Sequence, residues 1–211
     1  YGKEFEKYWM HNGYINIDGE KMSKSLGNFR LVADLLSHYP GEVLRFAILS
    51  AHYRSELNFG QALLEQAKAS LDTLYGFLRN VIDVVAEPCE LNESLAAYAA
   101  LLDDMNTPVA ISELHALAKA MNKATGEEQA RLKGCLLAVG KVMGLLQVEP
   151  DAWFQQGESD DDMVRIEKLV AERDDAKKNK AYARADAIRT ELLAEGIVLE
   201  DSRDGTKWRK S

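Results

Sequence analysis

The segment 13–28, GYINIDGEKMSKSLGN, decides how the first part of this chain is organised. Gly13–Ile17 has the residue pattern of a short β-strand, and Asp18-Gly19 is a dipeptide typical of turns. Beyond Leu26-Gly27-Asn28, apolar residues recur at helical spacing and predict a helix that includes Leu31. The segment therefore predicts a strand, a loop bounded by glycines, and a helix.

The loop carries Lys21-Met22-Ser23-Lys24-Ser25, in which two lysines and two hydroxyls can converge on one anion. Lysine supplies a mobile point charge, which suits a loop that must open again. Such a loop can close over a polyphosphate and neutralise the charge that develops as pyrophosphate leaves. A short Lys/Ser loop by itself is more often a solvated turn, so its function depends on the wider context of the chain.

Length and composition place the chain among ordinary globular proteins. It has 211 residues, which suggests one or two domains, with 46% hydrophobic and 28% charged side chains. No apolar run approaches the roughly 18 residues needed to cross a bilayer, and the charged start is not a signal peptide. We therefore expect no membrane partner and a cytoplasmic location. The first residue is Tyr1, which we interpret as the interior of a longer polypeptide.

The two cysteines, Cys89 and Cys135, are far apart and have no CxxC spacing. They suggest neither a disulfide framework nor a zinc site, and we predict two free thiols in helical segments. The histidines have no mutual spacing that indicates a metal site, so no metal ligands are predicted in this chain. They are His11, His38, His52 and His115.

Charge is distributed unevenly along the chain. The net charge of −8 argues against a nucleic-acid binder, because neutralising phosphates requires Lys and Arg. However, an acidic run at 158–162 is followed by eight cationic residues within 165–189 and four more in the tail. The last fifty residues are therefore predicted to present a basic face on an acidic protein.

Most of the remaining chain is predicted to be helical. Pro40 suits the first turn of one helix, and Thr107-Pro108 predicts an N-cap followed by proline at the first helical position. Gly196 predicts a helix end, and the last residues predict a small hairpin around 201–205. The longer helices are expected at about 60–85, 91–102, 108–124, 126–146, 163–179 and 181–195.

The string KMSKS, extended by Leu26-Gly27-Asn28, is identical to the second ATP-binding motif of class I aminoacyl-tRNA synthetases. Downstream, Glu42–Phe46 and Ser50–Phe59 resemble the stretch that follows this motif in cysteinyl-tRNA synthetases. Asp103–Pro108 is similar to the start of that family's DALR domain, and 183–209 is similar to its anticodon-binding module. The resemblance extends over essentially the whole chain in the right order.

The resemblance implies a mainly α fold. The end of a Rossmann-type catalytic domain, a strand–loop–helix, would be followed by helical bundles and a small helix-plus-β-hairpin C-terminal module. The implied domains are 1–30, the end of the catalytic domain with the KMSKS loop; 31–87, a helical stem-contact region; 88–150, a DALR-type bundle; 151–162, a linker; and 163–211, the anticodon-binding module.

The resemblance also implies an activity. Such enzymes activate cysteine with Mg-ATP and transfer it to tRNA-Cys. By resemblance, Lys24 contacts ATP and stabilises the first transition state, while Lys21, Ser23 and Ser25 shape the ATP loop around Met22. The family's first ATP motif, His-Ile-Gly-His, is absent, and its zinc ligands are expected upstream of Tyr1. The isolated chain is therefore predicted to be inactive in aminoacylation.

Anticodon recognition would use unstacked bases. Asp186 and Asp201 are acceptors that could pair with the N1–H and N2–H₂ groups of a guanine. Tyr182 and Trp208 have rings on which bases could stack, although both rings could instead form the core of the module. Asp186 could equally be an ordinary carboxylate on a helix surface.

Cations of the module are candidates for phosphate contacts, namely Lys177, Lys178, Arg209 and Lys210. The alternative for Lys177 and Lys178 is a solvated helix face. The family usually has Arg at the position of Lys177, which changes the expected contact because the two cations are not interchangeable.

Two other pairs are candidates by position. His52 and Arg54 are expected to support the packing of the helical region against the catalytic domain, with tRNA contact as the alternative. Trp9 and His11 could line the nucleotide pocket or belong to the core.

Two competing functions stay open. The cysteine ligase of mycothiol biosynthesis shares the loop but does not use tRNA, so it has no need of the module at 163–211. A non-catalytic RNA-binding module derived from a synthetase would have no need of the Lys21–Ser25 loop.

Overall fold

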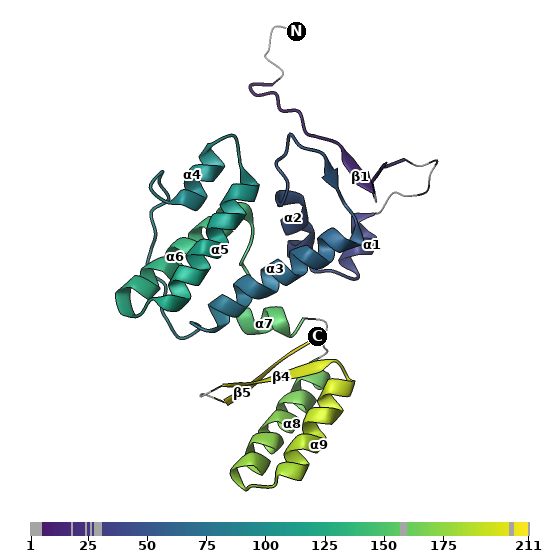
Figure 1. Cartoon of the computed structure of the whole chain (residues 1–211), viewed down its shortest axis with the longest axis vertical. Coiled ribbons are helices and arrows are strands. Elements are labelled where there is room, and N and C mark those ends of the chain that lie inside the picture. Colours follow the sequence, from purple (N-terminus) through teal and green to yellow (C-terminus); the bar gives the residue numbers. More distant parts are fainter. Residues whose placement is uncertain are drawn as a thin grey trace. The chain divides into compact units, whose positions relative to one another are not determined.

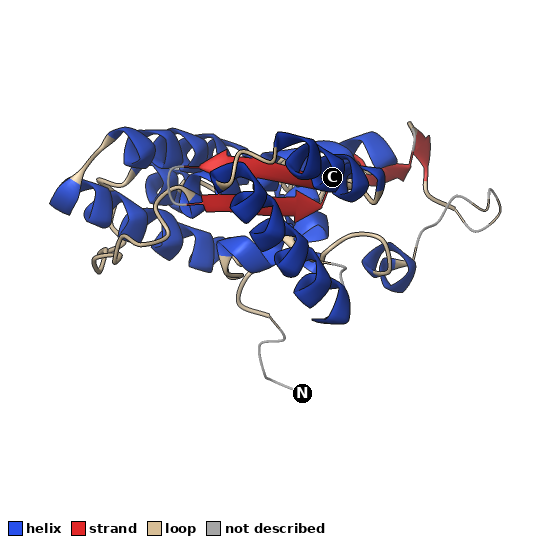
Figure 2. Cartoon of the chain, turned by 90° about the horizontal axis from the view of Figure 1, so that it is seen from below, coloured by secondary structure: helices blue, strands red, loops and turns tan. Residues whose placement is uncertain are grey.

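The computed structural model describes residues 6–17, 19–23, 25, 27, 31–156, 160–202 and 205–210. The chain divides into two compact units, Tyr1–Gln147 and Val148–Ser211, each with its own core (Figure 1). Helices make up most of both units, and the strands are few and short (Figure 2). The predicted mainly α fold is therefore confirmed.

The first unit begins with a small sheet of three short strands. These are β1 (Ile15–Ile17), β2 (Glu20–Lys21) and β3 (Leu57–Asn58). The strand order is β2-β1-β3, with β1 antiparallel to β2 and parallel to β3. The parallel pair joins segments about 40 residues apart in sequence, as in the edge of a Rossmann-type sheet.

Strand β1 begins at Ile15, two residues after the predicted start at Gly13, and Gly13 lies instead against the 53–55 segment. Its N–H donates to the carbonyl of Tyr53 at 2.7 Å, before the ladder of β1 begins. A Cβ at this position would lie 2.0 Å from the carbonyl oxygen of Ser55, so only glycine allows the two backbones to approach this closely.

Three helices continue the first unit, namely α1 (Val32–Leu36), α2 (Gly41–Leu49) and α3 (Gln61–Arg79). Pro40 precedes α2 as its N-cap residue, one position earlier than the sequence predicts. Buried apolar side chains of α2 and α3 form the core of this region; they are Val43, Phe46, Ala47, Leu64, Leu71 and Leu74.

Glu42 joins three parts of the first unit. Its carboxylate accepts from the hydroxyl of Tyr75 on α3 at 2.8 Å and from the backbone N–H of Leu146 at 2.7 Å. Burial is the main effect on this carboxyl and raises its pKa, against the lowering effect of these two hydrogen bonds.

Helix α3 ends at Arg79, six residues before the predicted end. The carbonyls of Val81, Ile82 and Val84 accept from the ammonium of Lys133 on another helix, so they do not continue the helical ladder. This tertiary interaction has no trace in the local periodicity.

A bundle of three helices follows, consisting of α4 (Ala96–Leu102), α5 (Thr107–Lys123) and α6 (Gly126–Met143). They lie side by side in Figure 1, with α5 in contact with both neighbours. The side chain of Asn106 accepts from the N–H of Val109, which corrects the prediction of Thr107 as the N-cap. Asn106 takes this role because Thr107 already belongs to the helix.

The second unit contains α7 (Pro150–Phe154), α8 (Asp160–Lys178) and α9 (Tyr182–Ala194), then β4 (Ile197–Ser202) and β5 (Gly205–Lys210). The strands form the predicted hairpin, with Leu199 opposite Trp208, and lie against α8 and α9 (Figure 1). Its core contains Ile166, Val170, Ile188, Leu192, Ile197 and Trp208.

The predicted linker needs a correction. Residues 150–154 form α7, in which Pro150 starts the helix and Trp153 is buried, and α7 contacts β5. A linker side chain would be solvated, so this part of 151–162 belongs to the second unit.

The cysteines also need a correction. Cys89 and Cys135 form a disulfide, with their Cα atoms 5.0 Å apart, and Cys89 lies in an irregular segment rather than in a helix. The prediction of two free thiols was wrong because a spacing of 46 residues along the chain gives no information on proximity in space.

No described helix combines the length and the apolar character that a membrane span requires.

Candidate nucleotide and tRNA sites

The candidate ATP loop leaves the sheet at the end of β2, after the turn that joins β1 to β2. Gly19 has a φ of 84°, and its N–H donates to the side-chain oxygen of Asn58 at 2.9 Å, which fixes the turn to β3. Gly27 has a φ of 64° on the far side of the loop. Both predicted hinges therefore adopt a left-handed conformation that favours glycine.

The described side chains of the loop are accessible from solvent. Lys21 lies at the end of β2 and is exposed, Met22 is 37% exposed, and the hydroxyls of Ser23 and Ser25 lie 3.2 Å apart. The structure therefore brings together the two predicted hydroxyls. Lys24, Leu26 and Asn28 lie outside the described residues.

The segment 52–54 contacts both the sheet and the bundle. Arg54 donates to Asp104 from Nε at 2.8 Å and from Nη2 at 3.1 Å, and the hydroxyl of Tyr53 donates to the same carboxylate at 2.6 Å. His52 stacks on Tyr53 and lies 3.8 Å from Asp104. Together with the hydrogen bond from Gly13 to Tyr53, these contacts fit the support role predicted for His52 and Arg54, and tRNA contact stays the alternative.

Asp104 is one of two residues of the candidate sites that the sequence did not indicate. Hydrogen bonds from Arg54 first, and Tyr53 second, lower its pKa to about 2. Asp104 and Met105 both have φ near 52°, which is uncommon for residues other than glycine. The turn is held in this conformation by partners about fifty residues away, which no local pattern could show.

A cavity of about 370 Å³ lies beside this segment. Its lining includes Met10, Asn12, Ile15, Ile48, Tyr53 and Met105. It is at the start of β1, whereas the turn at Gly19 that leads through β2 to the ATP loop follows the end of that strand. Ligands of open α/β sheets bind beyond the carboxyl ends of parallel strands, so this cavity is at the wrong end for ATP.

Trp9 and His11 are exposed, Trp9 by 72%, and therefore do not belong to the core of the described structure. Their predicted contact with the nucleotide stays a prediction.

In the second unit, Asp201 lies in a network of cations and hydroxyls. Arg173 donates to its two carboxylate oxygens at 2.8 and 3.1 Å, and the ammonium of Lys177 lies 3.0 Å from one of them. The hydroxyl of Thr206 lies 2.8 Å from the carboxylate of Asp201 and 2.6 Å from that of Asp174. The Arg173 hydrogen bonds are the main reason that the pKa of Asp201 lies well below its ordinary value.

Arg173 was not among the predicted site residues. It is 4% exposed, and its Nε is buried without a hydrogen-bond partner among the described residues. The side chain of Asp201 is 50% exposed, so a buried guanidinium holds a carboxylate that faces solvent. A buried arginine cannot be distinguished by sequence from the solvated cations around it.

The remaining predicted contacts are placed as follows. Tyr182 begins α9 and is 61% exposed, which leaves its ring accessible for stacking. Asp186 is exposed on the same helix. Arg209 on β5 donates to Glu200 on β4 at 2.9 Å.

Trp208 is placed in the core. Its ring is 3% exposed and packs in the apolar cluster of the module, so it is not available to stack on a base. The structure thus supports the core alternative for Trp208 and corrects its prediction as a stacking residue.

The predicted basic face is partly neutralised. Arg165 pairs with Glu195, Arg184 pairs with Glu172 at 2.7 Å, and Arg173 is buried. The segment is rich in cations, but each of these three is bound to a carboxylate, so the charge available for a basic face is smaller than the number of cations implies.

The donor sets present determine which cofactors fit. Lysine and serine side chains of the loop suit the phosphates of ATP. Among the described residues, no group of three or more His, Cys, Asp or Glu side chains is arranged around a common metal position. The disulfide between Cys89 and Cys135 withdraws both thiols from metal binding.

Comparison with known families accounts for this arrangement. Residues 1–69 match the class I tRNA synthetase (C) catalytic domain, 96–147 the DALR domain, and 163–209 the anticodon-binding domain of cysteinyl-tRNA ligase. The catalytic-domain match, which includes the ATP loop, defines a class I aminoacyl-tRNA synthetase. Within this class, the order and identity of all three matches show that the chain belongs to the cysteinyl-tRNA synthetase family.

Curated relatives agree with this assignment. The chain is 57% identical to cysteine–tRNA ligase of Saccharophagus degradans over 99% of its own length. It is 49% identical to the ligases of Paramagnetospirillum magneticum and Rhodospirillum rubrum, over 99% and 98% of its length. In each case the chain spans 46% of the relative, a little less than half.

Proposed function

We propose that this chain provides the ATP loop and the tRNA-binding regions of a cysteine–tRNA ligase that acts in the cytoplasm. The observation that carries the proposal is the match of three family domains in order along one chain, at 57% identity to one such ligase. The proposed reaction begins when the carboxylate of cysteine attacks the α-phosphorus of ATP and pyrophosphate leaves. A hydroxyl of the terminal adenosine of tRNA-Cys then attacks the adenylate, and AMP leaves.

The loop around Ser23 and Ser25 acts in the first step. Lys21 and Lys24 neutralise the charge that develops on the phosphates, and the two hydroxyls shape the loop around them. The left-handed glycines at 19 and 27 support a loop that opens and closes. Magnesium accompanies ATP in this step. By the family resemblance, we assign zinc binding to a part of the ligase that this chain does not cover.

The second unit recognises the anticodon. The carboxylate of Asp201, held by Arg173, offers acceptors to a base edge, while Lys177 beside it contributes a donor or a phosphate contact. Asp186 supplies a second acceptor, Tyr182 a stacking surface, and Arg209 a phosphate contact. A cysteine ligase that uses an amino-sugar has no need of this module, so the match at 163–209 disfavours that alternative.

A chimera tests the catalytic proposal. The part of the Saccharophagus degradans ligase that this chain does not cover is fused to residues 1–211, and charging of tRNA-Cys is measured. We expect charging by the chimera and none by the 211-residue chain alone. Lys24→Ala is expected to lower kcat by about 10²- to 10³-fold, whereas the exposed Lys119→Ala on α5 serves as the matched control. A folded, inactive chimera would refute the proposal, as would charging by the chain alone.

Anticodon recognition is tested separately with the 211-residue chain. Its affinity for tRNA-Cys and for a transcript with an altered anticodon is measured at two salt concentrations. Tighter binding of the cognate by about 1–3 kcal/mol per altered base is expected. Asp201→Asn is expected to remove this preference, and the exposed Glu191→Gln to retain it. Equal affinities with only a salt-dependent term would mean that the module holds the backbone without recognising bases.

A further inference from the structure

The 80–95 segment connects α3 to the bundle and is attached to α6 at successive points. Lys133 donates to three carbonyls at its start, at 2.7, 2.9 and 3.3 Å. The N–H of Glu87 then donates to the carbonyl of Ala130 at 3.1 Å. At Gly134, a Cβ would lie 1.7 Å from the carbonyl oxygen of Glu87, so the backbone lies directly against the helix.

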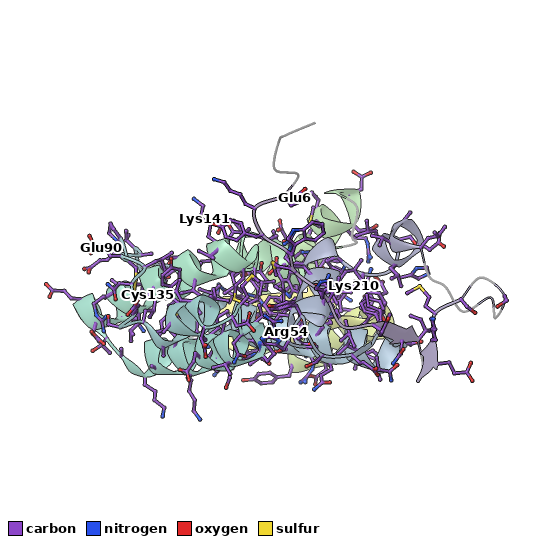
Figure 3. The ribbon with its side chains drawn as sticks, turned by 90° about the horizontal axis from the view of Figure 1, so that it is seen from above. Glu6, Arg54, Glu90, Cys135, Lys141 and Lys210 are labelled. Atoms are coloured by element: carbon purple, nitrogen blue, oxygen red, sulfur yellow. A yellow bond between two sulfur atoms is a disulfide. The ribbon has the colours of Figure 1, made fainter. Side chains whose placement is uncertain are left out.

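The last contact between the 80–95 segment and α6 is a covalent bond. The disulfide joins Cys89 to Cys135, one residue after Gly134 on α6. These are the chain's only cysteines, so each has one possible partner within the molecule. Figure 3 shows Cys135 and Glu90 at the same end of the molecule, with Cys89 next to Glu90 in sequence.

The two sulfur atoms differ in access. Cys135 is 5% exposed within α6, whereas Cys89 is half-buried between the exposed residues Pro88 and Glu90. An external thiol can therefore approach the disulfide at Cys89. The hydrogen bonds of Lys133 and Glu87 do not depend on the disulfide, so they keep the two cysteines close after reduction.

We propose that Cys89 and Cys135 form a reversible thiol–disulfide exchange site that reacts with small thiols and disulfides and attaches the 80–95 segment covalently to α6. The proposal goes beyond tRNA charging, because neither cysteine lies in the ATP loop or in the anticodon-binding unit. The proposal means that the bundle gains or loses this disulfide according to the thiols and disulfides in the surrounding solution.

The exchange proceeds in two balanced steps. The thiolate of a small thiol attacks Sγ of Cys89, the disulfide breaks, and its electron pair leaves on Sγ of Cys135, which takes a proton from water. A second thiol attacks the external sulfur of the mixed disulfide and releases Cys89. In total, the protein disulfide gains two electrons and two protons, and two small thiols become one small disulfide. The reverse reaction oxidises the protein.

The charge around Cys89 selects among reagents. Glu87 and Glu90 are exposed on either side of it, and Glu93 follows on the same segment. Two cations of α6 have other partners, since Arg131 pairs with Glu128 and attracts Glu87, and Lys133 donates to backbone carbonyls. The site therefore attracts cationic thiols and repels anionic ones, to an extent that salt reduces.

Redox titration of the 211-residue chain tests the proposal. The chain is equilibrated with mixtures of reduced and oxidised dithiothreitol, blocked with a maleimide under denaturing conditions, and weighed by mass spectrometry. Two blocked thiols are expected to appear together as the mixture becomes reducing, with little singly blocked chain. Two blockable thiols at every ratio, or only intermolecular dimers in the oxidising mixtures, would refute the proposal.

The rate of reduction tests the assigned point of attack. Cysteamine, a cationic thiol, is expected to reduce the disulfide at least about threefold faster than glutathione at equal thiolate concentration. Glu90→Gln is expected to narrow this difference, and Glu113→Gln on α5 is the matched control. Equal rates for both reagents at low salt would contradict attack at Cys89.

The conformational effect is measured by NMR relaxation on the same samples. Backbone order parameters at 88–95 are expected to fall on reduction, while those of α3 are unchanged. Cys89→Ser and Cys135→Ser are expected to give the reduced pattern under all conditions, and either variant keeps the test valid if the other folds poorly. Identical order parameters in both redox states would show that the bond has no structural effect.

Discussion

The two units of this chain are stabilised in different ways. The first unit, Tyr1–Gln147, contains most of the buried apolar side chains, and its candidate ATP loop lies outside that core. The second unit, Val148–Ser211, has a small apolar cluster and a buried arginine whose ion pair holds a candidate base-contacting residue. Small domains bury too little apolar surface for the hydrophobic effect alone to make them stable. In the second unit, therefore, stability and the candidate site depend on the same residues, whereas in the first they are separate.

Removing Trp208 should give the largest change in stability. Trp208→Ala deletes the largest side chain of the small cluster and is expected to reduce the free energy of unfolding of the second unit by about 3–5 kcal/mol. The buried Trp153 serves as a fluorescent reporter in urea titrations. Trp208→Phe should lose less than half as much. A small loss in the alanine variant would show that the cluster is not the core of the unit.

Removing the buried guanidinium should have the next largest effect. Arg173→Met leaves Asp201 without its main partner and is expected to destabilise the second unit by about 2–3 kcal/mol, at the low end for a buried pair because Asp201 is half exposed. Lys177→Met removes a more exposed cation and should cost under about 1 kcal/mol. Equal effects of the two variants in the same urea titration would contradict the distinction between a buried and a surface cation.

Asp104 should make the stability of the first unit depend on acid. Its pKa is lowered in the folded state from 3.8 to about 2, so its contribution is complete above the unfolded-state value and is lost as the pH falls between these values. Asp104→Asn should remove this part of the pH dependence and lower Tm slightly at pH 7. Thermal denaturation from pH 2 to 7 measures both effects. An unchanged profile in the variant would mean that the contacts to Arg54 and Tyr53 do not contribute to stability.

The ATP loop should give the smallest change in stability. Ser23→Ala and Lys21→Ala alter side chains outside the core, so the free energy of unfolding is expected to change by less than about 0.5 kcal/mol. In the chimera, Lys21→Ala is nevertheless expected to slow the formation of the adenylate. A loss of stability comparable to that of Arg173→Met would contradict the separation of site and core in the first unit.

The sequence predicts the features that depend on near neighbours along the chain. The strand, the left-handed glycines at 19 and 27, most helices and the hairpin all follow from local periodicity and turn residues. The family resemblance also identifies the loop that follows β2.

What the sequence does not show depends on distant partners. Lys133 binds the carbonyls after α3 from about fifty residues away, and Asp104 is bound by the segment around Arg54. The burial of Arg173 and Trp208, and the disulfide, likewise arise from packing between elements. A buried arginine and a solvated one can have the same neighbours in the sequence, so only the tertiary structure distinguishes them.

The hydrogen bond from Leu146 to Glu42 has a consequence for synthesis on the ribosome. Its two residues are 104 positions apart. The carboxylate of Glu42 therefore cannot accept this hydrogen bond until Leu146, just beyond α6, has been synthesised. At about 5–20 residues per second, this interval is roughly 5 to 20 s. During that time the carboxylate stays hydrated on nascent helices, and its burial is one of the last events in the assembly of the unit.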